Sequence, residues 1–381
     1  MEVLTVAKKR ANGEGTIRLR SDGRWEAKYT LGYKTKSIYA KTQEEVRKKL
    51  NQVLNDIENG VNIKGNNITV SEWLNIWLFE YKKGNIKASS FQGYEKLTRY
   101  HLIPDFGKIK LKNLTVDHVQ RMVNSKDKAG LSKRTIQYIK STLCTALNQA
   151  IRNRLILHNV AEAVKLPNKK PKERRILTEQ EQQELLKTVE TENKGFMVKF
   201  ALFTGLRCGE LLGLRWRDVD MENKTITVNQ NIQRLYGDDG RSHLVVTDTP
   251  KTKSSNRTIP LLLEIFNGLL KHHGLQSRER YIAGQLWNDN GLVFCTALGK
   301  AYDPRNFQGY LDRITNKIGI ERVNIHALRH AFASRSLERG ISLKVVSEML
   351  GHSSIQITAD IYSHVSIEHM ENELQKLREI I

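Results

Sequence analysis

The sequence has no run of 18 apolar residues, the length that a membrane-spanning helix needs. Its start, Met1–Val3, lacks the apolar stretch of a secretory signal peptide. The three cysteines, Cys144, Cys208 and Cys295, are too widely spaced along the chain for a disulfide framework or a zinc ribbon. There is also no internal repeat and no low-complexity tract. These absences predict a globular protein of the reducing cytoplasm that uses no metal and no cofactor.

The charge of the chain is more informative than its size. Its 381 residues are enough for two or three domains, and 39% of them are hydrophobic. Lys and Arg number 62 against 41 Asp and Glu, and this net charge of +21 favours a polyanionic partner. Ribosomal and membrane-surface proteins are also this basic, so the distribution matters more. Residues 1–67 carry +6 and residues 68–174 carry +13, whereas residues 175–381 carry only +2. The binding charge therefore lies in the first half, and the second half has another task.

Alternating segments near the N-terminus predict a three-stranded β-sheet followed by a helix. The turn Ser21–Gly23 separates the first two strands, and Thr42 with Glu45 begins an amphipathic helix that runs to about Glu58. The three predicted strands are Thr16–Arg20, Arg24–Tyr29 and Lys36–Tyr39.

One face of this predicted sheet is basic and aromatic. Its side chains are Arg18, Arg20, Arg24, Trp25 and Lys28. A β-sheet with such a face can enter a DNA groove. The alternative is an ordinary solvated surface, since unpatterned charge usually is one.

Residues 68–163 are predicted to be wholly helical, with an apolar stripe from Trp73 to Tyr81 that forms core. Further helices are expected at Ala88–Leu102, Val116–Asn124 and Lys133–Asn153. The last one begins with Lys133 and Arg134 and also carries Lys140, and a basic helix N-terminus is suited to binding phosphate. The segment Leu166–Arg175 contains two prolines and several basic residues, among them Lys169 and Lys170, and is predicted to be an exposed linker that can lie along a DNA backbone.

From Leu177 onward the pattern mixes helices with short strands and predicts an α+β domain that is mainly helical. Strands are expected at Thr225–Val228, Leu244–Thr247, Arg257–Pro260 and Leu292–Phe294. Helices are expected at Pro304–Lys317, Ala327–Arg339 and Leu343–Leu350, with a final amphipathic helix from about Ser366 to the end.

Four motifs in this second half are unusual for their chemistry. Their positions are Thr204–Leu211, with Arg207 and Glu210; the basic hairpin Pro250–Pro260; His326-Ala327-Leu328-Arg329-His330; and Leu350-Gly351-His352, followed ten residues later by Tyr362. Taken singly, each has an ordinary structural explanation, such as a helix salt bridge or a packed tyrosine. The pair His326 and His330 has half of a zinc-helix spacing, but position 327 is Ala where a zinc protease has Glu, so metal is not expected.

Together the four motifs supply the groups that a phosphoryl transfer needs. Two arginines can hold the non-bridging oxygens of a phosphate and neutralise the charge of the transition state. A tyrosine hydroxyl can attack phosphorus, a lysine can protonate the leaving oxygen, and a histidine can accept the tyrosine proton. A covalent phosphotyrosine would keep the energy of the broken bond, so religation would need no ATP.

In this order the motifs resemble those of the tyrosine recombinases, also called the phage integrase family. The resemblance covers nearly the whole chain: residues 1–65 resemble an arm-type DNA-binding domain, residues 68–165 a helical core-binding domain and residues 176–381 the catalytic domain, with 166–175 as linker. It implies a multidomain fold of a small sheet with one helix, a helical bundle and a mixed catalytic domain. It further implies an integrase of a temperate phage or conjugative transposon.

The resemblance also assigns roles to residues. It implies that Arg207 and Arg329 clamp the phosphate, that His326 is the general base, that His352 binds or positions the phosphate, and that Tyr362 is the nucleophile forming a 3′-phosphotyrosine. Glu210 resembles the support of the first arginine turn. The catalytic lysine is taken as Lys251, and a shift in the hairpin would exchange it with Lys253, which otherwise binds DNA.

The family comparison implies partners as well: double-stranded DNA with core and arm sites, four protomers assembled on DNA, an excision factor and a host DNA-bending protein, in the cytoplasm of a bacterial host. The tail from Ser366 to Ile381 resembles the helix that packs on a neighbouring protomer, although packing on its own domain is the alternative. Three other functions stay open: a chromosome-dimer resolvase, which lacks an arm domain; a non-catalytic DNA-binding regulator on the same fold; and a type IB topoisomerase.

Since each phosphate contact releases a counterion, we expect binding to duplex DNA to weaken steeply with salt. Dissociation constants measured between about 50 and 200 mM salt should rise by about 1,000-fold or more if six or more phosphates are contacted. A flat salt response would contradict the assignment of the basic first half to DNA.

Overall fold

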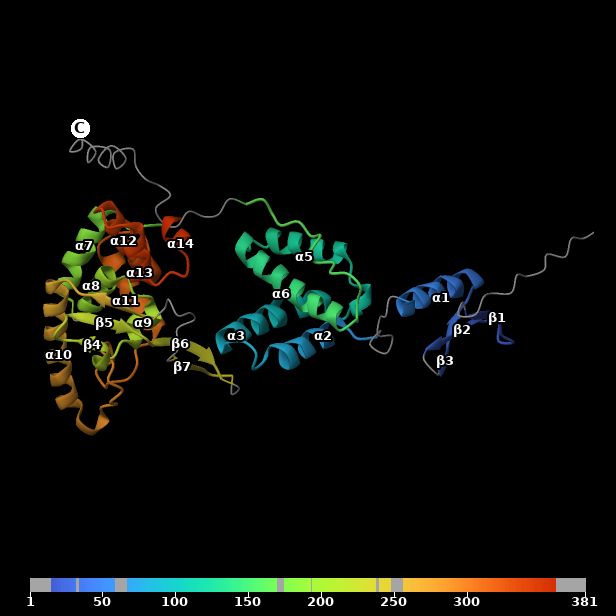
Figure 1. Ribbon diagram of the computed structural model, residues 1–381, viewed down its shortest axis with the longest axis horizontal. Helices are drawn as coiled ribbons and strands as arrows, with labels where there is room; N and C mark the ends of the chain where they lie inside the picture. Colours follow the sequence, from blue (N-terminus) through green and yellow to red (C-terminus); the bar gives the residue numbers. More distant parts are fainter. Residues whose placement is uncertain are drawn as a thin grey trace, which may run out of the picture. The chain divides into compact units, whose positions relative to one another are not determined.

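The computed structural model describes residues 15–31, 34–58, 67–169, 175–192, 194–237, 240–247 and 256–360. The chain forms two compact units, an N-terminal unit of residues 1–171 and a C-terminal unit of residues 172–381 (Figure 1). The boundary between them lies inside the predicted linker 166–175. The further division of the N-terminal unit into two DNA-binding domains stays a prediction.

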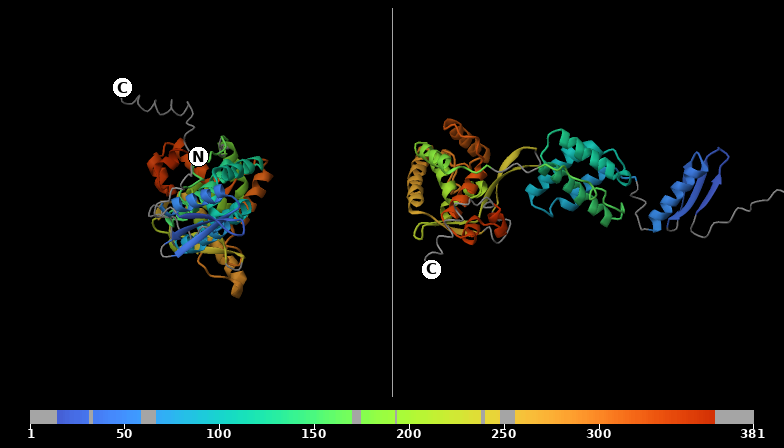
Figure 2. Two further views of the ribbon diagram at one scale, coloured as in Figure 1. Left: turned by 90° about the vertical axis from the view of Figure 1, so that its right-hand side faces the viewer. Right: turned by 90° about the horizontal axis from the view of Figure 1, so that it is seen from above.

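The N-terminal unit begins with the expected sheet and helix. The elements are β1 (Thr16–Leu19), β2 (Trp25–Leu31), β3 (Lys34–Ala40) and α1 (Gln43–Glu58), and the antiparallel strand order is β1-β2-β3. Gly23, at φ +78°, makes the turn between β1 and β2, because this left-handed conformation carries no Cβ penalty for glycine. Helix α1 packs on one face of the sheet, where Ala27, Val46 and Leu50 are buried (Figure 2).

The strand register corrects one prediction about this sheet. Arg18 lies opposite Glu26, and Tyr39 lies opposite Glu26 on the other side, so these three side chains share the face away from α1. Trp25 is one residue away from Glu26 along β2, so its side chain lies on the opposite face, where it packs against the hydrophobic cluster beneath α1. The prediction that Trp25 joins the basic face was therefore wrong. The aromatic ring of that face is Tyr39, with the guanidinium carbons of Arg20 and Arg24 each 5.5 Å from its centre.

The rest of the N-terminal unit is helical, as expected. Its elements are α2 (Val70–Ile76), the π-helix η2 (Trp77–Lys82), α3 (Ala88–Leu97), the π-helix η3 (Thr98–Leu102), α4 (Ile103–Phe106), the 3₁₀ turn η4 (Leu111–Asn113), α5 (Val116–Lys128) and α6 (Lys133–Arg152). The predicted helix Ala88–Leu102 thus changes to π geometry at Thr98. A capping box of Thr69 and Glu72 starts α2, and the buried indole of Trp73 donates to the Ala146 carbonyl at 3.0 Å, which ties α2 to α6.

The C-terminal unit places short sheets among helices. Its elements are α7 (Glu179–Glu190), α8 (Gly195–Thr204), α9 (Cys208–Gly213), η5 (Trp216–Asp218), β4 (Val219–Asp220), β5 (Thr225–Val228), β6 (Asn231–Tyr236), β7 (Ser242–Thr247), β8 (Arg257–Pro260), α10 (Leu263–Ala283), η7 (Gly284–Leu286), α11 (Pro304–Lys317), α12 (Ile325–Glu338), α13 (Leu343–Leu350) and α14 (Ile355–Ala359). One antiparallel sheet has the order β4-β5-β8, and β6 pairs with β7 in a separate ribbon.

Most predicted bounds in this unit agree with the structure within two residues, but one prediction is wrong. Leu292–Phe294 does not form a strand; Leu292 makes an isolated bridge to Arg215. These side chains are buried in the core without a ladder, because an apolar run can be buried from a loop as well as from a strand. The predicted helix from Ser366 lies outside the described residues.

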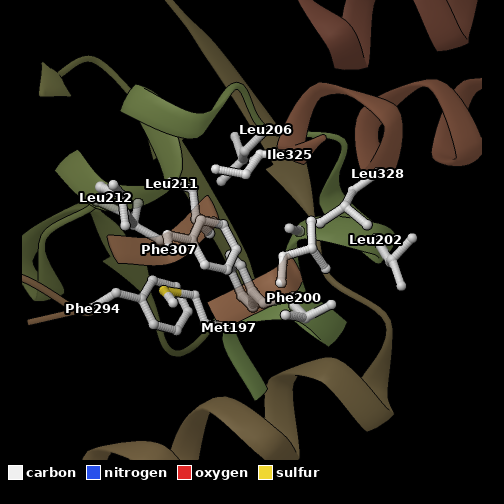
Figure 3. Packing of buried hydrophobic residues seen from close by; sticks show 14 of the residues in the cluster. Met197, Phe200, Leu202, Leu206, Leu211, Leu212, Phe294, Phe307, Ile325 and Leu328 are labelled. Carbon is white, nitrogen blue, oxygen red and sulfur yellow. The ribbon is translucent and has the colours of Figure 1, made fainter. Parts of the chain in front are cut away.

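Three candidate site residues directly follow residues that are buried in the core of the C-terminal unit. Figure 3 shows part of this core, in which Leu206 and Ile325 belong to the same buried cluster as Phe200 and Leu328. Leu206 directly precedes Arg207, Ile325 precedes His326 and Leu328 precedes Arg329. Since buried neighbours fix the backbone, these site residues stand on the edge of a packed core. Within the described residues, no helix is long and apolar enough to cross a membrane.

Candidate active site

The first candidate residue, Arg207, lies at the corner between α8 and α9. Gly205 ends α8 at φ +62°, and a Cβ there would lie 2.5 Å from the Phe332 ring, so only glycine fits this turn. Arg207 is the N-cap residue of α9. Its backbone N–H donates to Glu210 Oε2 at 3.0 Å, and its Nη1 donates to Glu210 Oε1 at 2.7 Å. Glu210 therefore fixes the conformation of the turn, at the position where the family resemblance implies a supporting residue.

Arg329 reaches the same corner from α12. It is only 2% exposed, and its Nη1 donates to the Gly205 carbonyl at 2.8 Å. Its Nη2 donates to the Leu350 carbonyl at 2.7 Å. Arg329 is thus bonded both to the corner that carries Arg207 and to the end of α13. These bonds hold it near Arg207, the other arginine that is predicted to hold the phosphate. Burial, and then the positive charge of Arg207, lower the pKa of Arg329 to about 9, so the guanidinium stays protonated at neutral pH.

The C-terminus of α13 holds three arginines from three different elements. The carbonyl of Met349 accepts from Arg257 Nε at 2.6 Å, that of Leu350 from Arg329, and that of Gly351 from Arg207 Nη2 at 3.1 Å. Gly351, at φ +63°, ends the helix, and its N–H donates back to Glu348. A helix C-terminus has orphan carbonyls and partial negative charge, so it is well suited to guanidinium donors.

Arg257 is a member of this cluster that the sequence did not reveal. It begins β8 and is 6% exposed, and its Nη1 and Nη2 donate to the two Glu210 oxygens at 3.3 and 2.8 Å. Its membership follows only from the fold, because its partners are 47 and 92 residues away. The one local signal was its place in the basic hairpin motif, which pointed to the lysines instead.

Within the part of the chain that the structure describes, Glu210 is the one carboxylate bonded to these guanidiniums. It is 8% exposed, and burial alone would raise the pKa of its carboxyl. The hydrogen bonds and charge of Arg257, and the charge of Arg207, outweigh burial and lower the pKa to about 2. Glu210 is therefore ionised, and Glu210, Arg207, Arg257 and Arg329 together carry a net charge of +2. This excess of positive charge is suited to a phosphate dianion or diester.

His352 follows the α13 terminus directly and lies beside this positive cluster. Its Nδ1 is 2.8 Å from the hydroxyl oxygen of Thr358, on the short helix α14. Burial, and then the charges of Arg329 and Arg207, lower the pKa of His352 to about 4. The imidazole is therefore neutral at pH 7 and its Nε2 is the remaining ring nitrogen for a ligand.

The predicted general base, His326, is the second residue of α12 and is exposed. Its ring packs edge-on against the largely buried ring of His330, with centroids 4.7 Å apart and planes at 84°. Asn324 caps the helix through Ala327 N–H at 2.8 Å. The cap and the ring contact restrict where the His326 imidazole can lie.

The predicted nucleophile Tyr362, the lysines Lys251 and Lys253, and the linker residue Lys170 lie outside the described residues. Their roles remain predictions. The described part of the site is thus formed by Arg207, Glu210, Arg257, Arg329 and His352, with His326 on the same helix as Arg329.

The predicted DNA-binding residues of the sheet lie on one face of it. Arg18 is 60% exposed, and its Nε donates to the buried carboxylate of Glu26 at 2.6 Å. Arg20 lies 3.6 Å from the same carboxylate, and Lys28 follows Glu26 by one full strand repeat. The hydrogen bond from Arg18 lowers the pKa of Glu26 to about 2. Arg24 instead pairs with Asp22 at 2.8 Å. Glu26 is thus a fixed counter-charge beneath an exposed basic surface.

The other predicted DNA-binding residues make local contacts in the helical part. Lys133 begins α6 after the cap Ser132. Arg134 donates to the Tyr138 hydroxyl at 3.0 Å, Lys140 donates to the Val164 carbonyl at 2.7 Å, and Lys169 pairs with Asp127. Whether these side chains contact DNA stays a prediction.

Two models of protein families match this sequence. Residues 175–369 match the phage integrase family, and residues 69–126 match the phage integrase N-terminal SAM-like domain. The chain belongs to the phage integrase family of tyrosine recombinases. Members of this family cut and rejoin DNA, so the chain is a DNA strand-breaking and rejoining enzyme. The family inferred from the motifs is confirmed.

Curated relatives match this recombinase over nearly its whole length. It is 34% identical over 359 residues to the tyrosine recombinase XerC-like protein of Caldanaerobacter subterraneus subsp. tengcongensis, which covers 91% of this chain and 92% of that protein. It is 29% identical over 377 residues to an integrase of Streptomyces ambofaciens, covering 94% of each chain.

Solved structures share the fold of this recombinase. The Tn1549 transposon integrase in complex with circular intermediate DNA aligns with a TM-score of 0.67 at 23% identity, covering 81% of this chain and 100% of that one. A lambda integrase tetramer bound to a Holliday junction aligns with a TM-score of 0.60 at 17% identity, covering 93% and 96%. The expected multidomain, mainly helical fold class is confirmed.

The depressed pKa of His352 predicts a pH dependence of stability. In the unfolded chain this histidine takes up a proton near 6.5, whereas the folded chain keeps it neutral down to about 4. Between these values the unfolded state binds more protons, so the free energy of unfolding falls as the pH falls. We expect His352→Asn to lose less stability than the wild type over this interval, measured by urea unfolding at a series of pH values.

The control for this measurement is His243→Asn, at an exposed histidine of β7 in the same unit. Its unfolding curves at the same pH values are the reference for a histidine substitution at the surface of the unit. If His352→Asn retains all of the wild-type pH dependence, the folded His352 is not held neutral and the electrostatic account of the cluster is wrong.

Proposed function

We propose that this recombinase integrates and excises a mobile genetic element at specific DNA sites through a 3′-phosphotyrosine formed on Tyr362. The observation that carries the proposal is the attachment of Arg207 and Arg329 to the Gly351 and Leu350 carbonyls. These carbonyls directly precede His352, and Tyr362 follows ten residues later in the sequence. Two guanidiniums are therefore bonded to the segment that leads, along the sequence, through His352 to the predicted nucleophile.

In the proposed reaction the Tyr362 hydroxyl attacks the scissile phosphorus while Arg207 and Arg329 hold the two non-bridging oxygens. The bond from phosphorus to the 5′ oxygen breaks as the bond to the tyrosine oxygen forms. His326 accepts the tyrosine proton, Lys251 or Lys253 donates a proton to the leaving 5′ oxygen, and His352 donates Nε2–H to the phosphate. Attack by a 5′-hydroxyl reverses these steps and rejoins DNA without ATP.

The N-terminal unit supports the assignment to a mobile element. Its sheet has a basic outer face and its own hydrophobic cluster beneath α1. A chromosome-dimer resolvase needs no such additional DNA-binding face. Among the relatives are an integrase of Staphylococcus phage L54a and the Tn916 transposase of Enterococcus faecalis. We propose that the sheet binds arm sites, that the helical part and the linker bind the core site, and that four protomers assemble on DNA in the bacterial cytoplasm with an excision factor and a host bending protein.

The alternative is a DNA-binding regulator that keeps this fold without catalysis. The arginines at the α13 terminus argue against it. Holding three guanidiniums near each other is electrostatically costly, and burying the charge of Arg329 adds a desolvation cost that an exposed DNA-binding arginine does not have.

The nucleophile can be tested with a nicked suicide duplex built from the end sequence of the mobile element, incubated without metal or ATP. We expect a covalent protein–DNA product on a denaturing gel from the wild type and none from Tyr362→Phe, because the phenyl ring lacks the attacking oxygen. Binding without any covalent product in either protein would favour the regulator. A product that persists in Tyr362→Phe would identify a different tyrosine.

The division of labour can be tested with Arg18→Ala and Lys28→Ala. Each should weaken binding to a duplex from the sequences flanking the core by about 10-fold and reduce the salt dependence of binding, while cleavage of the core suicide duplex is unchanged. Lys48→Ala is the matched control, because Lys48 pairs with Glu44 on the exposed side of α1. Equal losses of arm binding and core cleavage would contradict separate arm and core functions.

A further inference from the structure

Arg257 has a different set of contacts from the two arginines that are predicted to hold the phosphate. Its three guanidinium nitrogens all donate to protein acceptors, namely the Met349 carbonyl through Nε and the two Glu210 oxygens through Nη1 and Nη2. Arg207 is 38% exposed and its bonds to protein leave donors for a ligand. Arg329 is buried as well, but its two bonds to main-chain carbonyls use Nη1 and Nη2 and not Nε. Arg257, which uses Nε, Nη1 and Nη2, is therefore assigned to the support of the site.

Glu210 has two opposing effects on Arg207, and Arg257 reduces the unfavourable one. The carboxylate is needed to hold the Arg207 turn, since it accepts both the backbone N–H and Nη1 of Arg207. Its negative charge also competes with a DNA phosphate for the same guanidinium. With Arg257 in place, the charge of Glu210 is shared between two arginines. Without Arg257, the carboxylate would keep its hydrogen bonds from Arg207, and more of its charge would act on Arg207, which would have less attraction left for phosphate.

The same side chain also fixes the geometry of the α13 terminus. Its bond to the Met349 carbonyl joins β8 to the residue that precedes Leu350 and Gly351, whose carbonyls hold Arg329 and Arg207. Arg257 therefore contacts both supports of Arg207, the carboxylate of Glu210 and the end of α13. A lysine would provide the charge but not the planar, three-nitrogen arrangement.

We propose that Arg257 is a positioning residue of the recombination reaction, which neutralises Glu210 so that Arg207 keeps its charge for the scissile phosphate. The inference rests on the proposed function, in that the ligand of Arg207 is a DNA phosphate. It assigns to Arg257 a role that acts on Arg207 mainly through Glu210, with the bond to the end of α13 as a second support.

A double-mutant cycle on the cleavage step tests this dependence. The proteins are the wild type, Arg257→Met, Glu210→Gln and the double variant, and the measurement is the single-turnover rate on the nicked suicide duplex at saturating protein. We expect Arg257→Met to slow cleavage by about 10-fold or more in the wild-type background and by less than about 3-fold in the Glu210→Gln background. Affinity for the uncleaved duplex should change little, because the phosphate is one contact among many.

The control is Arg280→Met, which removes one positive charge from the same unit at an exposed ion pair with Asp289. It should cleave at the wild-type rate. Arg257→Lys should lie between the wild type and Arg257→Met, since it restores the charge without the geometry. Equal rate losses from Arg257→Met in both backgrounds, or an Arg257→Lys variant no better than Arg257→Met, would overturn the proposed role.

A second readout does not depend on cleavage or on knowledge of the DNA site. Inorganic phosphate is titrated into the same proteins by calorimetry, with circular dichroism to check folding. Arg257→Met should weaken phosphate binding, and the added Glu210→Gln change should restore part of it. Restoration excludes simple loss of structure, because the double variant lacks still more buried contacts. Unaltered phosphate affinity in Arg257→Met overturns the inference.

The two experiments separate this inference from the function on which it rests. A wild-type protein that forms no covalent product, yet shows the expected pattern with phosphate, overturns the proposed recombination mechanism and supports the relation between Arg257 and Arg207. A wild-type protein that cleaves, but shows no coupling between positions 257 and 210, overturns only the inference.

Discussion

The C-terminus of α13 is the structural feature on which the candidate site depends. The carbonyls of Met349, Leu350 and Gly351 accept hydrogen bonds from Arg257, Arg329 and Arg207, which come from β8, α12 and the α8–α9 corner. Three guanidiniums repel one another, so they remain close only where acceptors are already arranged to receive them. The partial negative charge of a helix end provides such acceptors without adding another ionised group that would compete with DNA.

Among the described residues of the arginine cluster, Glu210 is the one carboxylate, and a second would have a cost. A buried negative charge is needed to fix the Arg207 turn, and its pKa of about 2 shows how strongly the surrounding guanidiniums favour the ionised form. A second carboxylate would bring the net charge of the cluster down to +1 and weaken its attraction for a phosphate. The arrangement keeps a positive field in place before DNA arrives, so little reorganisation is needed when charge develops on the phosphate oxygens.

Features that depend on neighbouring residues were predictable from the sequence, whereas contacts between residues far apart in the chain were not. The bounds of α11 and α13 agree with the prediction, and in the structure Asp303 and Ser342 cap these helices. The support of the Arg207 turn by Glu210 was implied by the family resemblance of the motif, and the two side chains are hydrogen-bonded. Arg257 was missed because its partners are brought to it only by folding. Trp25 was placed on the wrong face because the composition of a strand does not reveal which parity faces the helix. The predicted strand at Leu292–Phe294 was wrong because a buried loop and a buried strand can have the same run of apolar residues.

The anchors of the three arginines belong to the main chain, and this has a consequence for the inheritance of the site. No substitution at position 349 or 350 can remove a carbonyl oxygen, so the side chains there are constrained by packing, Leu350 in a buried cluster, and not by these hydrogen bonds. The site therefore depends on the identity of the three arginines and on Gly351, whose φ of +63° ends α13. The acceptors of these three bonds are thus protected from mutation, whereas the carboxylate of Glu210 is not.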